Sequence, residues 1–376
     1  MIKNVENENS SLTPEETKDK LVGDAAPTNA PEGFAETENP LLSVIVPSYN
    51  SEDYLSRCLR TLVDYKHWLE VIVVNDGSTD STGELAEEWA RNYPHNIRVC
   101  HQENKGHGGA LNTGIAAATG TYLKVVDSDD WVDRAAMETV LEELAAALER
   151  GETLDMLVTN YVYEKQGRDR KAVMRYRNAL PVGETVGWES LGRLRYEQYL
   201  MMHAITFRTQ VVRDSGLRVL EKNFYVDFIY SFVPLPYVKT LRYVDVDLYR
   251  YFIGRDDQSV NEKVMITRTD QLQRVNDALV DAMPRREELN PRLFRYMIHY
   301  MRINFAALSV FLILAGSEKH LEQRELLWSK VKRERPDIYR SLSRGPLGRG
   351  ISIPGRIGQH ITIVGYRVST AVLGFN

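Results

Sequence analysis

Between Leu41 and about Glu149, short apolar runs alternate with segments whose apolar residues recur at helical spacing. The runs are continuous and rich in Val and Ile, which is typical of strands buried on both faces of a parallel sheet. The predicted strands are 42–46, 69–74, 97–100 and 122–126, and the predicted helices are 54–63, 80–92, 109–118 and 137–148. Asp80 suits the N-cap of the second helix. This alternation predicts an α/β fold with helices on both faces of the sheet.

The pattern from about residue 150 to 265 is more irregular. It predicts strands over 154–163, 204–207 and 240–252, and helices over 188–200 and 224–232. From Asp270 onward the pattern is helical. The longest apolar run in this part, Asn304–Ala315, is shorter than the roughly 18 residues that a membrane-spanning helix needs, so we expect a buried core helix there.

The chain therefore divides into four segments. Residues 1–39 are rich in Glu, Asn, Thr and Pro without a hydrophobic period, which is typical of a disordered acidic tail. Two halves of one α/β domain follow over 40–150 and 151–265, and a helical extension occupies 266–376. The end of this extension is basic and amphipathic, which favours either a helix packed on the body or an interfacial helix attracted to anionic lipid.

Composition narrows the classes of function. The 376 residues carry a formal net charge of −5, which argues against general nucleic-acid binding. Both cysteines, Cys58 and Cys100, lie in apolar patterns, which favours buried free thiols in a reducing cytoplasm over a disulfide. The first residues are polar and acidic, unlike a secretory signal peptide. We expect a cytoplasmic protein that the basic C-terminal helix could hold peripherally at the inner face of the cell membrane.

The segment Val125–Asp130 (VVDSDD) places three aspartates at the end of a predicted buried strand. Crowded carboxylates repel one another and are costly to desolvate, so they are tolerated mainly around a cation. A hard divalent cation with oxygen ligands and open positions for phosphate oxygens meets this need. Because ligands bind at the carboxyl ends of strands in open α/β sheets, this segment predicts a metal–diphosphate site.

Polar loops follow the other three predicted strands. Pro47–Asn50 forms a turn that can offer amide groups to a base, and the loop 75–80 contains Asp76, which could accept from an imide N–H such as that of uracil. The loop 104–112 clusters glycines at a helix start, where backbone N–H groups and Lys105 favour an anion. Taken singly, each loop is also compatible with ordinary turn and capping chemistry.

Together these motifs resemble the nucleotide-binding half of family 2 glycosyltransferases. The resemblance rests on SVIVPSYN, VNDGSTDST, NKGHGGALNTG and VDSDD in this order and spacing. It is strong over about 41–135 and weaker to about 260. The resemblance implies a GT-A fold, with a Rossmann-like, mostly parallel sheet, and transfer of a sugar from a nucleotide diphosphate donor with inversion. Residues 40–150 would then bind the nucleotide sugar, and 151–265 the acceptor.

The resemblance also implies roles for individual residues. Asp127 and Asp129 would form the DxD pair that binds Mg²⁺ or Mn²⁺, with Asp127 also near the ribose. The nucleotide contacts would come from Pro47, Tyr49, Asn50, Asp76, Lys105 and Gly108. Where the family often has an Ala-Arg-Asn segment, this chain has Ala110-Leu111-Asn112, so an arginine contact from this loop is not expected.

An inverting reaction needs a base for the acceptor hydroxyl, and Asp227 is the candidate. In the family this acid often follows a Glu, which Val226 replaces here, and burial among aromatics would raise its pKa. The alternative is an N-cap for the segment 228–232. Weaker candidates for contacts to the substrate or its diphosphate are Asp130, His203, Arg255 and Gln258. For His203, a satisfied structural histidine is the alternative.

The sequence thus predicts an inverting, metal-assisted glycosyltransferase that uses a nucleotide sugar, a UDP-sugar by the uracil-binding interpretation of Asp76. The acceptor would be a hydroxyl of a saccharide, a lipid-linked saccharide or a cell-surface glycan. One alternative is a nucleotidyltransferase of similar core, although Pro47–Asn50 stands where such enzymes carry a Gly-rich basic loop. The other is a catalytically silent GT-A binding protein, against which Asp127, Asp129 and Asp227 argue.

Overall fold

The computed structural model describes residues 39–63, 65, 68–165, 167, 171–254 and 262–373, with side chains to 368. Residues 36–376 form one compact unit. The predicted tail lies outside the described residues except for Asn39. The predicted boundary at 150 falls directly after helix α5 (Arg134–Glu149). The predicted boundary at 265 falls inside the short helix α8 (Glu262–Thr267).

A sheet of ten strands organises the described residues. Its order is β3-β2-β1-β4-β9-β6-β10-β5, with β7 on β6 and β8 on β10. Strands β1 to β4 pair in parallel, as do β6 and β10, whereas β9 is antiparallel to both β4 and β6. The strands are β1 (Leu42–Ser48), β2 (Leu69–Asp76), β3 (Ile97–Gln102), β4 (Tyr122–Val125), β5 (Trp131–Val132), β6 (Met156–Lys165), β7 (Ala172–Met174), β8 (Thr185–Val186), β9 (Ile205–Arg208) and β10 (Leu241–Ile253). The predicted α/β architecture is confirmed, and the sheet is mixed.

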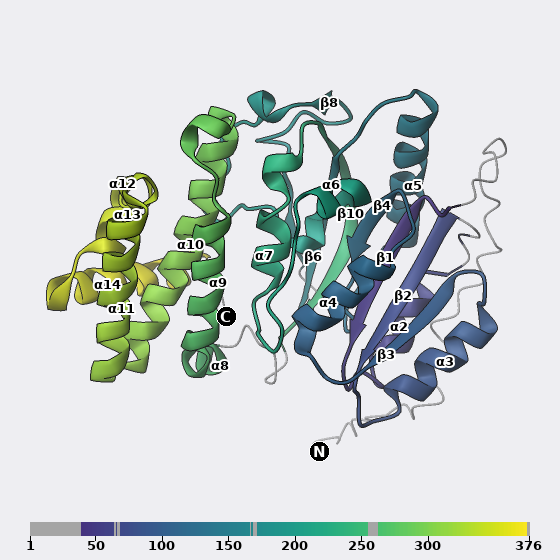
Figure 1. The fold of residues 1–376 in the computed structure, drawn as a ribbon, viewed down its shortest axis with the longest axis horizontal. Helices are drawn as coiled ribbons and strands as arrows, with labels where there is room; N and C mark the ends of the chain where they lie inside the picture. Colours follow the sequence, from purple (N-terminus) through teal and green to yellow (C-terminus); the bar gives the residue numbers. More distant parts are fainter. Residues whose placement is uncertain are drawn as a thin grey trace, which may run out of the picture. The chain divides into compact units, whose positions relative to one another are not determined.

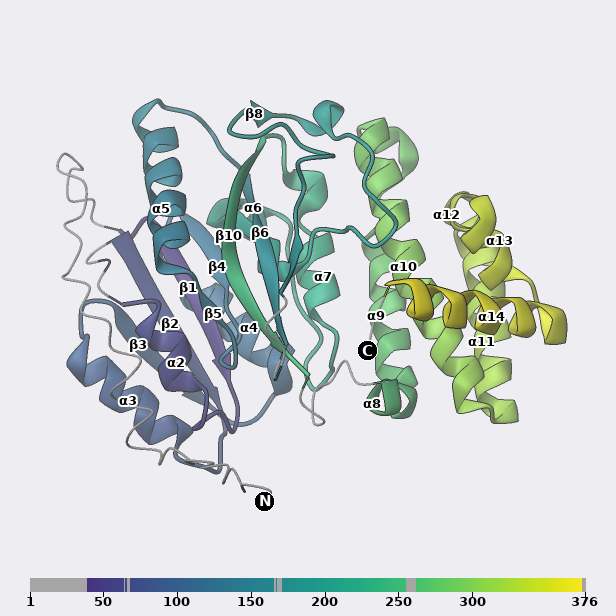
Figure 2. The same ribbon diagram turned by 180° about the vertical axis from the view of Figure 1, so that it is seen from behind.

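Helices cover both faces of this sheet, which explains the continuous apolar strands. Every residue of β1 and β4 is buried. In Figures 1 and 2, α4 (Gly106–Ala117) and α6 (Thr209–Asp214) lie on one face, and α2 (Leu55–Arg60) and α5 (Arg134–Glu149) lie on the other. Helix α3 (Thr82–Asn92) packs beside α2. Such two-sided burial requires Val and Ile at successive positions rather than at alternate ones.

Two local predictions change. Helix α3 begins at Thr82, with Ser81 at the N-cap position, although Asp80 Oδ1 still accepts from the Thr82 N–H at 3.0 Å. The helix predicted over 188–200 is wrong, because only the 3₁₀ turn Trp188–Ser190 forms and the rest is irregular. Gln198 in this segment instead donates to the carbonyl of Arg175 at 2.6 Å, so long-range hydrogen bonds override the local pattern.

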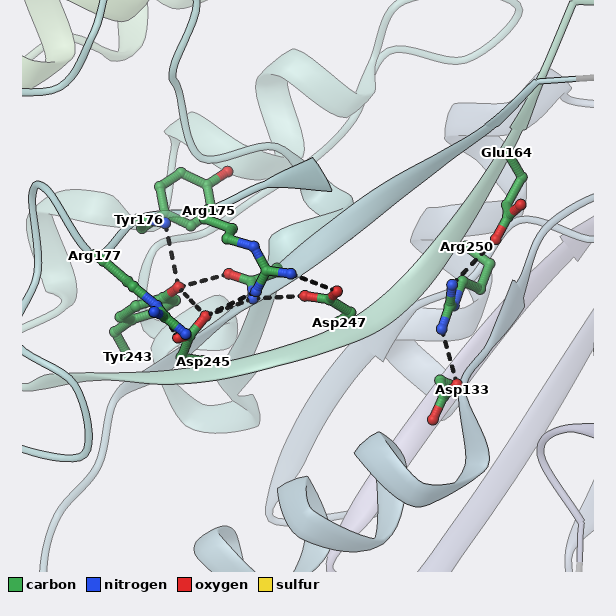
Figure 3. Close-up of polar contacts among 10 residues, drawn as sticks. Asp133, Glu164, Arg175, Tyr176, Arg177, Tyr243, Asp245, Asp247 and Arg250 are labelled. Carbon is green, nitrogen blue, oxygen red and sulfur yellow. Dashed lines mark hydrogen bonds and ion pairs between the residues drawn. The ribbon is translucent and has the colours of Figure 1, made fainter. Parts of the chain in front are cut away.

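Strand β10 is held by one arginine at a bulge and by another arginine beyond it. The register with β6 shifts between Tyr243 and Tyr249, and Arg175 bonds Asp245 and Asp247 at 3.2 and 2.7 Å there. Farther along, Arg250 lies between Asp133 and Glu164, at 2.8 and 3.1 Å (Figure 3). The ion pairs of Arg250 fix the end of β10. This end carries the aromatic residues Tyr249, Tyr251 and Phe252.

The remaining helices form a C-terminal body around one long helix. They are α7 (Asp227–Phe232), α8 (Glu262–Thr267), α9 (Thr269–Ala282), α10 (Pro291–Ala315), α11 (Glu318–Glu334), α12 (Pro336–Leu342), α13 (Gly345–Ser352) and α14 (Gly355–Leu373). Helix α10 packs against α9 and against each of α11 to α14. It starts well before the predicted Asn304, and its length and composition would suffice to cross a membrane. Because 61% of its most apolar 18-residue window is buried, α10 has the environment of the core helix that we predicted.

Candidate active site

The four loops singled out in the sequence meet at the carboxyl edge of the parallel strands. Asn50 Oδ1 accepts from the Thr79 N–H at 2.9 Å, which joins the first loop to the second. Ser51 and Ser128 share a hydroxyl hydrogen bond of 2.8 Å, which joins the first loop to the acidic segment. Asp76 Oδ1 accepts from the Lys105 N–H at 2.8 Å, which joins the second loop to the third. The loops therefore form one continuous surface.

The first two loops present one exposed ring and one buried acid. Tyr49 is 51% exposed, whereas Pro47 lies within β1 opposite Val74. Asn50 has a φ of 47°, a left-handed conformation that asparagine tolerates better than most residues. Asp76 is buried, and its Oδ1 also accepts from Gln102 Nε2 at 2.6 Å. Asp76 thus orders the third loop, and its contact with a uracil ring stays a prediction.

Glycines in the third loop allow another segment to pack closely against α4. A Cβ on Gly108 would lie 2.0 Å from the carbonyl oxygen of Leu220. The carbonyl of Lys105 accepts from the Lys222 N–H at 2.6 Å, and Asn112 exchanges two hydrogen bonds of 2.9 Å with the Val219 backbone. Packing therefore accounts for Gly108 without a ligand. It also places residues 219–222, which precede Asp227, beside the predicted donor loop.

The aspartates after β4 have three different environments. Asp127 is partly buried, its N–H donates to Tyr249 Oη at 3.2 Å, and its Oδ1 has no hydrogen-bond partner among the described residues. The carbonyl of Asp129 accepts from Arg57 Nη2 at 2.7 Å. Asp130 is buried, with Oδ2 accepting from Tyr249 Oη at 2.6 Å and Oδ1 from the Phe252 N–H at 2.7 Å. Asp130 therefore joins the acidic loop to β10, a structural role that the sequence did not suggest.

Burial is the main cause of the pKa shifts of these acids. It raises the pKa of Asp127 and Asp130 well above the usual range, and the charge of Asp129 raises both pKa values further. Asp133 instead caps α5 by accepting from the Ala136 N–H at 3.1 Å. Carboxylates in this state are stabilised by any cation that enters the site.

His203 lies against Asp127 and is not a satisfied structural histidine. It is 3% exposed, its Nε2 lies 4.0 Å from Asp127 Oδ2, and its Nδ1 has no hydrogen-bond partner within the described chain. Its ring stacks on Tyr251, with centroids 4.4 Å apart. Burial, with help from the Lys124 charge, lowers the pKa of His203 to about 3. The imidazole is therefore neutral and able to act as a ligand.

A buried lysine beneath the site positions this histidine. Lys124, inside β4, donates from Nζ to the carbonyls of His203 and Ile205 at 2.9 and 3.3 Å. Burial lowers the pKa of Lys124 to about 7. The sequence analysis did not indicate this role, because Lys124 only interrupts an otherwise apolar strand directly before the acidic segment Val125–Asp130.

The residues at this edge fit a divalent cation. Asp127, Asp130 and His203 each offer a ligand atom within 4.8 Å of the others. Two of the unpartnered buried atoms in the described part of the chain, Asp127 Oδ1 and His203 Nδ1, belong to this group. Two carboxylates and an imidazole suit Mg²⁺ or Mn²⁺ in a partly open site. Asp129 lies outside this group, so its predicted place on the metal is not tested by the geometry.

Asp227 is the first residue of α7, and Val226 occupies the N-cap position without a side-chain bond. The N-cap alternative for Asp227 is therefore wrong. The preceding Tyr225 has a φ of 64°, a strained conformation for an aromatic residue. Burial raises the pKa of Asp227 to about 6, against the opposing effect of His107. A partly buried carboxyl with a raised pKa, preceded by strained backbone, suits a general base.

Helix α9 fixes the strained segment before Asp227. The Phe224 N–H donates to Gln271 Oε1 at 2.8 Å, and Arg274 Nε donates to Asn223 Oδ1 at 2.9 Å. The Arg268 guanidinium lies over the Phe224 ring at 3.6 Å. The C-terminal body thus supports the acceptor side of the site.

Two further residues were missed by the sequence analysis. His107, in the third loop, places Nε2 3.7 Å from Asp127 Oδ1, and burial lowers its pKa against the charges of Asp227 and two other acids. Its place in the glycine-rich motif was a usable signal. Arg57, which holds Asp129, has its guanidinium over the Trp131 ring at 4.1 Å, and nothing in its helical pattern marked it. Arg255 and Gln258 lie outside the described residues.

Comparisons with known proteins agree with this geometry. Residues 43–212 match the family model Glycosyl transferase family 2. EpsH of Bacillus subtilis is 31% identical over 57% of this chain and 62% of EpsH, and the glycosyltransferase YibD of Escherichia coli is 30% identical over 56% and 61%. The aligned part thus spans about three fifths of the length of these relatives. Residues 1–349 of TarS from S. aureus align with a TM-score of 0.59 at 19% identity, over 87% of this chain and 92% of TarS 1–349, and so share the fold.

The family match covers all of β1 to β9 and includes the loops that meet at the carboxyl edge. The fold likeness extends beyond it through most of the C-terminal body. Residues 43–212 are therefore a glycosyltransferase family 2 domain, and the chain has the GT-A fold that its motifs indicated.

Proposed function

We propose that the protein is an inverting glycosyltransferase that moves a sugar from a UDP-sugar to a hydroxyl of a saccharide, lipid-linked saccharide or cell-surface glycan. The observation that carries the proposal is the cluster at the end of β4, where Asp127 Oδ1 is buried without a hydrogen-bond partner among the described residues and His203 lies against the same carboxylate. Family membership supports the reaction class. The TarS crystal structure with UDP-GlcNAc, a protein of the same fold, supports a UDP-linked donor.

One set of residues would bind the donor and its metal ion, and Asp227 would act on the acceptor. Asp127, Asp130 and His203, with Asp129 from the DxD pair, would hold Mg²⁺ or Mn²⁺, which when bound offsets negative charge on the diphosphate leaving group. Tyr49 and Asp76 would contact the base, and Lys105 would lie along the nucleotide. Asp227 would accept the proton of the acceptor hydroxyl as that oxygen attacks the anomeric carbon.

Particular residues argue against the two alternatives, a nucleotidyltransferase and a catalytically silent binding protein. A nucleotidyltransferase would need a basic, glycine-rich loop after β1, where Pro47–Asn50 stands. A silent binding protein would not need a strained backbone beside an acid of raised pKa, which Tyr225 and Asp227 provide. We place the activity in the cytoplasm, peripheral to the inner face of the cell membrane, where lipid-linked acceptors are found.

The test is a panel of UDP-sugars assayed for UDP release with Mn²⁺ and with EDTA. We expect one donor to be turned over only with the cation. Asp227→Asn should keep UDP affinity by calorimetry and lose about 100-fold or more in turnover, the usual contribution of a general base. Asp129→Ala should lose cation-dependent UDP binding. Asp270→Asn, which removes an acid that is 63% exposed on α9, is the matched control and should behave as wild type.

Two results would contradict the proposal. If Asp227→Asn turned over at the rate of Asp270→Asn, the base would be another group. If Asp129→Ala bound UDP with unchanged dependence on the cation, the metal assignment of this aspartate would be wrong.

A further inference from the structure

Helix α14 presents a line of apolar side chains to solvent. Ile357 is 74% exposed, Ile361 43%, Val364 48% and Val368 58%. Their spacings of four, three and four residues repeat the helical turn, so all four lie on one face. We call these four residues the apolar stripe. Scattered exposed apolar residues are normal on proteins, but a continuous stripe of this length indicates a binding surface.

The opposite face fixes α14 on the C-terminal body. Gly358 and Thr362 are buried, and a Cβ on Gly358 would lie 1.8 Å from the carbonyl oxygen of Ile353. Tyr366 Oη donates to Glu262 of α8. Figure 2 shows α14 crossing the near side of the C-terminal helices. Because this docked face determines the rotation of the helix, the apolar stripe points outward and is not available to the protein core.

The segment that carries the apolar stripe is basic, while Glu325 and Glu262 from other helices bond Gly355 and Tyr366 on α14. No acidic residue follows Asp337 in the sequence, and the arginines in this part are all exposed. They are Arg340, Arg344, Arg349, Arg356 and Arg367. Arg356 directly precedes the first residue of the apolar stripe, and His360 directly precedes the second.

We propose that the apolar stripe and these arginines bind the surface of a bilayer that contains anionic phospholipid. An amphipathic helix lying in the interface buries its apolar face at the acyl boundary, and arginines beside it attract anionic headgroups. A second copy of the chain fits this surface poorly, because two-fold pairing would bring both sets of arginines together. Helix α10 does not supply the attachment, since most of its apolar window is buried. The proposal does not depend on sugar transfer.

The experiment is flotation of the full chain with vesicles of phosphatidylcholine alone or of phosphatidylcholine and phosphatidylglycerol in equal parts. We expect binding only to the anionic vesicles, and weaker binding as salt rises. Ile361→Asn with Val364→Asn should lower the partition coefficient about tenfold or more. Arg349→Gln with Arg356→Gln should lower it about fivefold for each arginine.

The matched controls change exposed residues of α11 that belong neither to the apolar stripe nor to its arginines. Leu326→Asn removes an apolar residue of α11 that is 60% exposed, and Arg333→Gln removes a paired surface arginine. Both should float as wild type, and all variants should melt at the wild-type temperature. Flotation of the Ile361/Val364 double variant equal to that of wild type overturns the proposal. So does a dimer in light scattering that the same variant dissociates, with no vesicle binding by wild type. Turnover of a soluble acceptor should be unchanged in all variants.

Discussion

At the scale of single residues, Asp227 links burial to a pH dependence. Its pKa is raised to about 6, so it is ionised above that pH and protonated below it. A base must be ionised to accept a proton. We expect turnover to fall as the pH drops through about 6, and a profile of kcat against pH with saturating donor measures this. A profile that stays flat to pH 5 would contradict the assignment.

The raised pKa of Asp227 also predicts that the folded chain becomes less stable as this carboxyl ionises. The folded pKa of Asp227 lies above its unfolded value, so its contribution to stability is full below the unfolded pKa and is lost as pH rises through about 6. Asp227→Asn should therefore raise the free energy of unfolding at pH 8 by about 1–3 kcal/mol. Near pH 3.5 the gain should be absent. Urea denaturation at the two pH values, beside Asp270→Asn as control, measures it.

His107 connects the two acidic groups of the site. Its Nε2 lies 3.7 Å from Asp127, and its charge lowers the pKa of Asp227. Removing the imidazole should then raise the pKa of Asp227, so the acid limb of kcat in His107→Ala should move to higher pH. His95→Ala, which changes an exposed histidine, should leave the limb in place. An unmoved limb in both variants would mean that His107 does not influence the base.

At the scale of elements, the contact of α4 with residues 219–222 brings the donor loop and the acceptor side together. Gly108→Ala would place a methyl group 2.0 Å from the Leu220 carbonyl, so backbone must move. We expect a loss of about 1–3 kcal/mol in the free energy of unfolding, as for other overpacked sites. Gly365→Ala is the control, because nothing lies within 4 Å of its Cβ and alanine favours a helix. Equal stability of the two variants would show that the contact is loose.

The elements also show where sequence patterns suffice. The first four strands were predicted within about two residues, because strands buried on both faces must be continuously apolar. The meeting of the four motif loops could be predicted as well, because parallel strands share one carboxyl edge. The two-residue β5 and the irregular segment after Trp188 depend on pairing with β10 and on long-range bonds of Gln198, which no local pattern contains. His203 was a candidate site residue, but its contact with Asp127 depends on β9, which directly follows it and pairs antiparallel with β4 from far along the chain.

At the scale of the whole molecule, β10 joins the two halves of the site. It pairs with β6 and β5 and is anchored by Arg250 to Asp133 and Glu164 (Figure 3). It also brings the Tyr249 hydroxyl to Asp130. Helix α9 then holds the segment before Asp227. The candidate base and the acidic cluster therefore lie on elements that are held by different contacts.

This bracing keeps buried carboxylates together at a cost that a cation would offset. The raised pKa values of Asp127 and Asp130 mean that stability is lost as pH rises through them, while a cation that binds only the folded chain adds stability by mass action. At about 100 times its Kd, the gain is about 2.7 kcal/mol. We expect Mn²⁺ to raise the melting temperature more at pH 8 than at pH 5, and EDTA to reverse the rise. Asp127→Asn should lose most of the response. A response of wild-type size in that variant would place the ion away from Asp127.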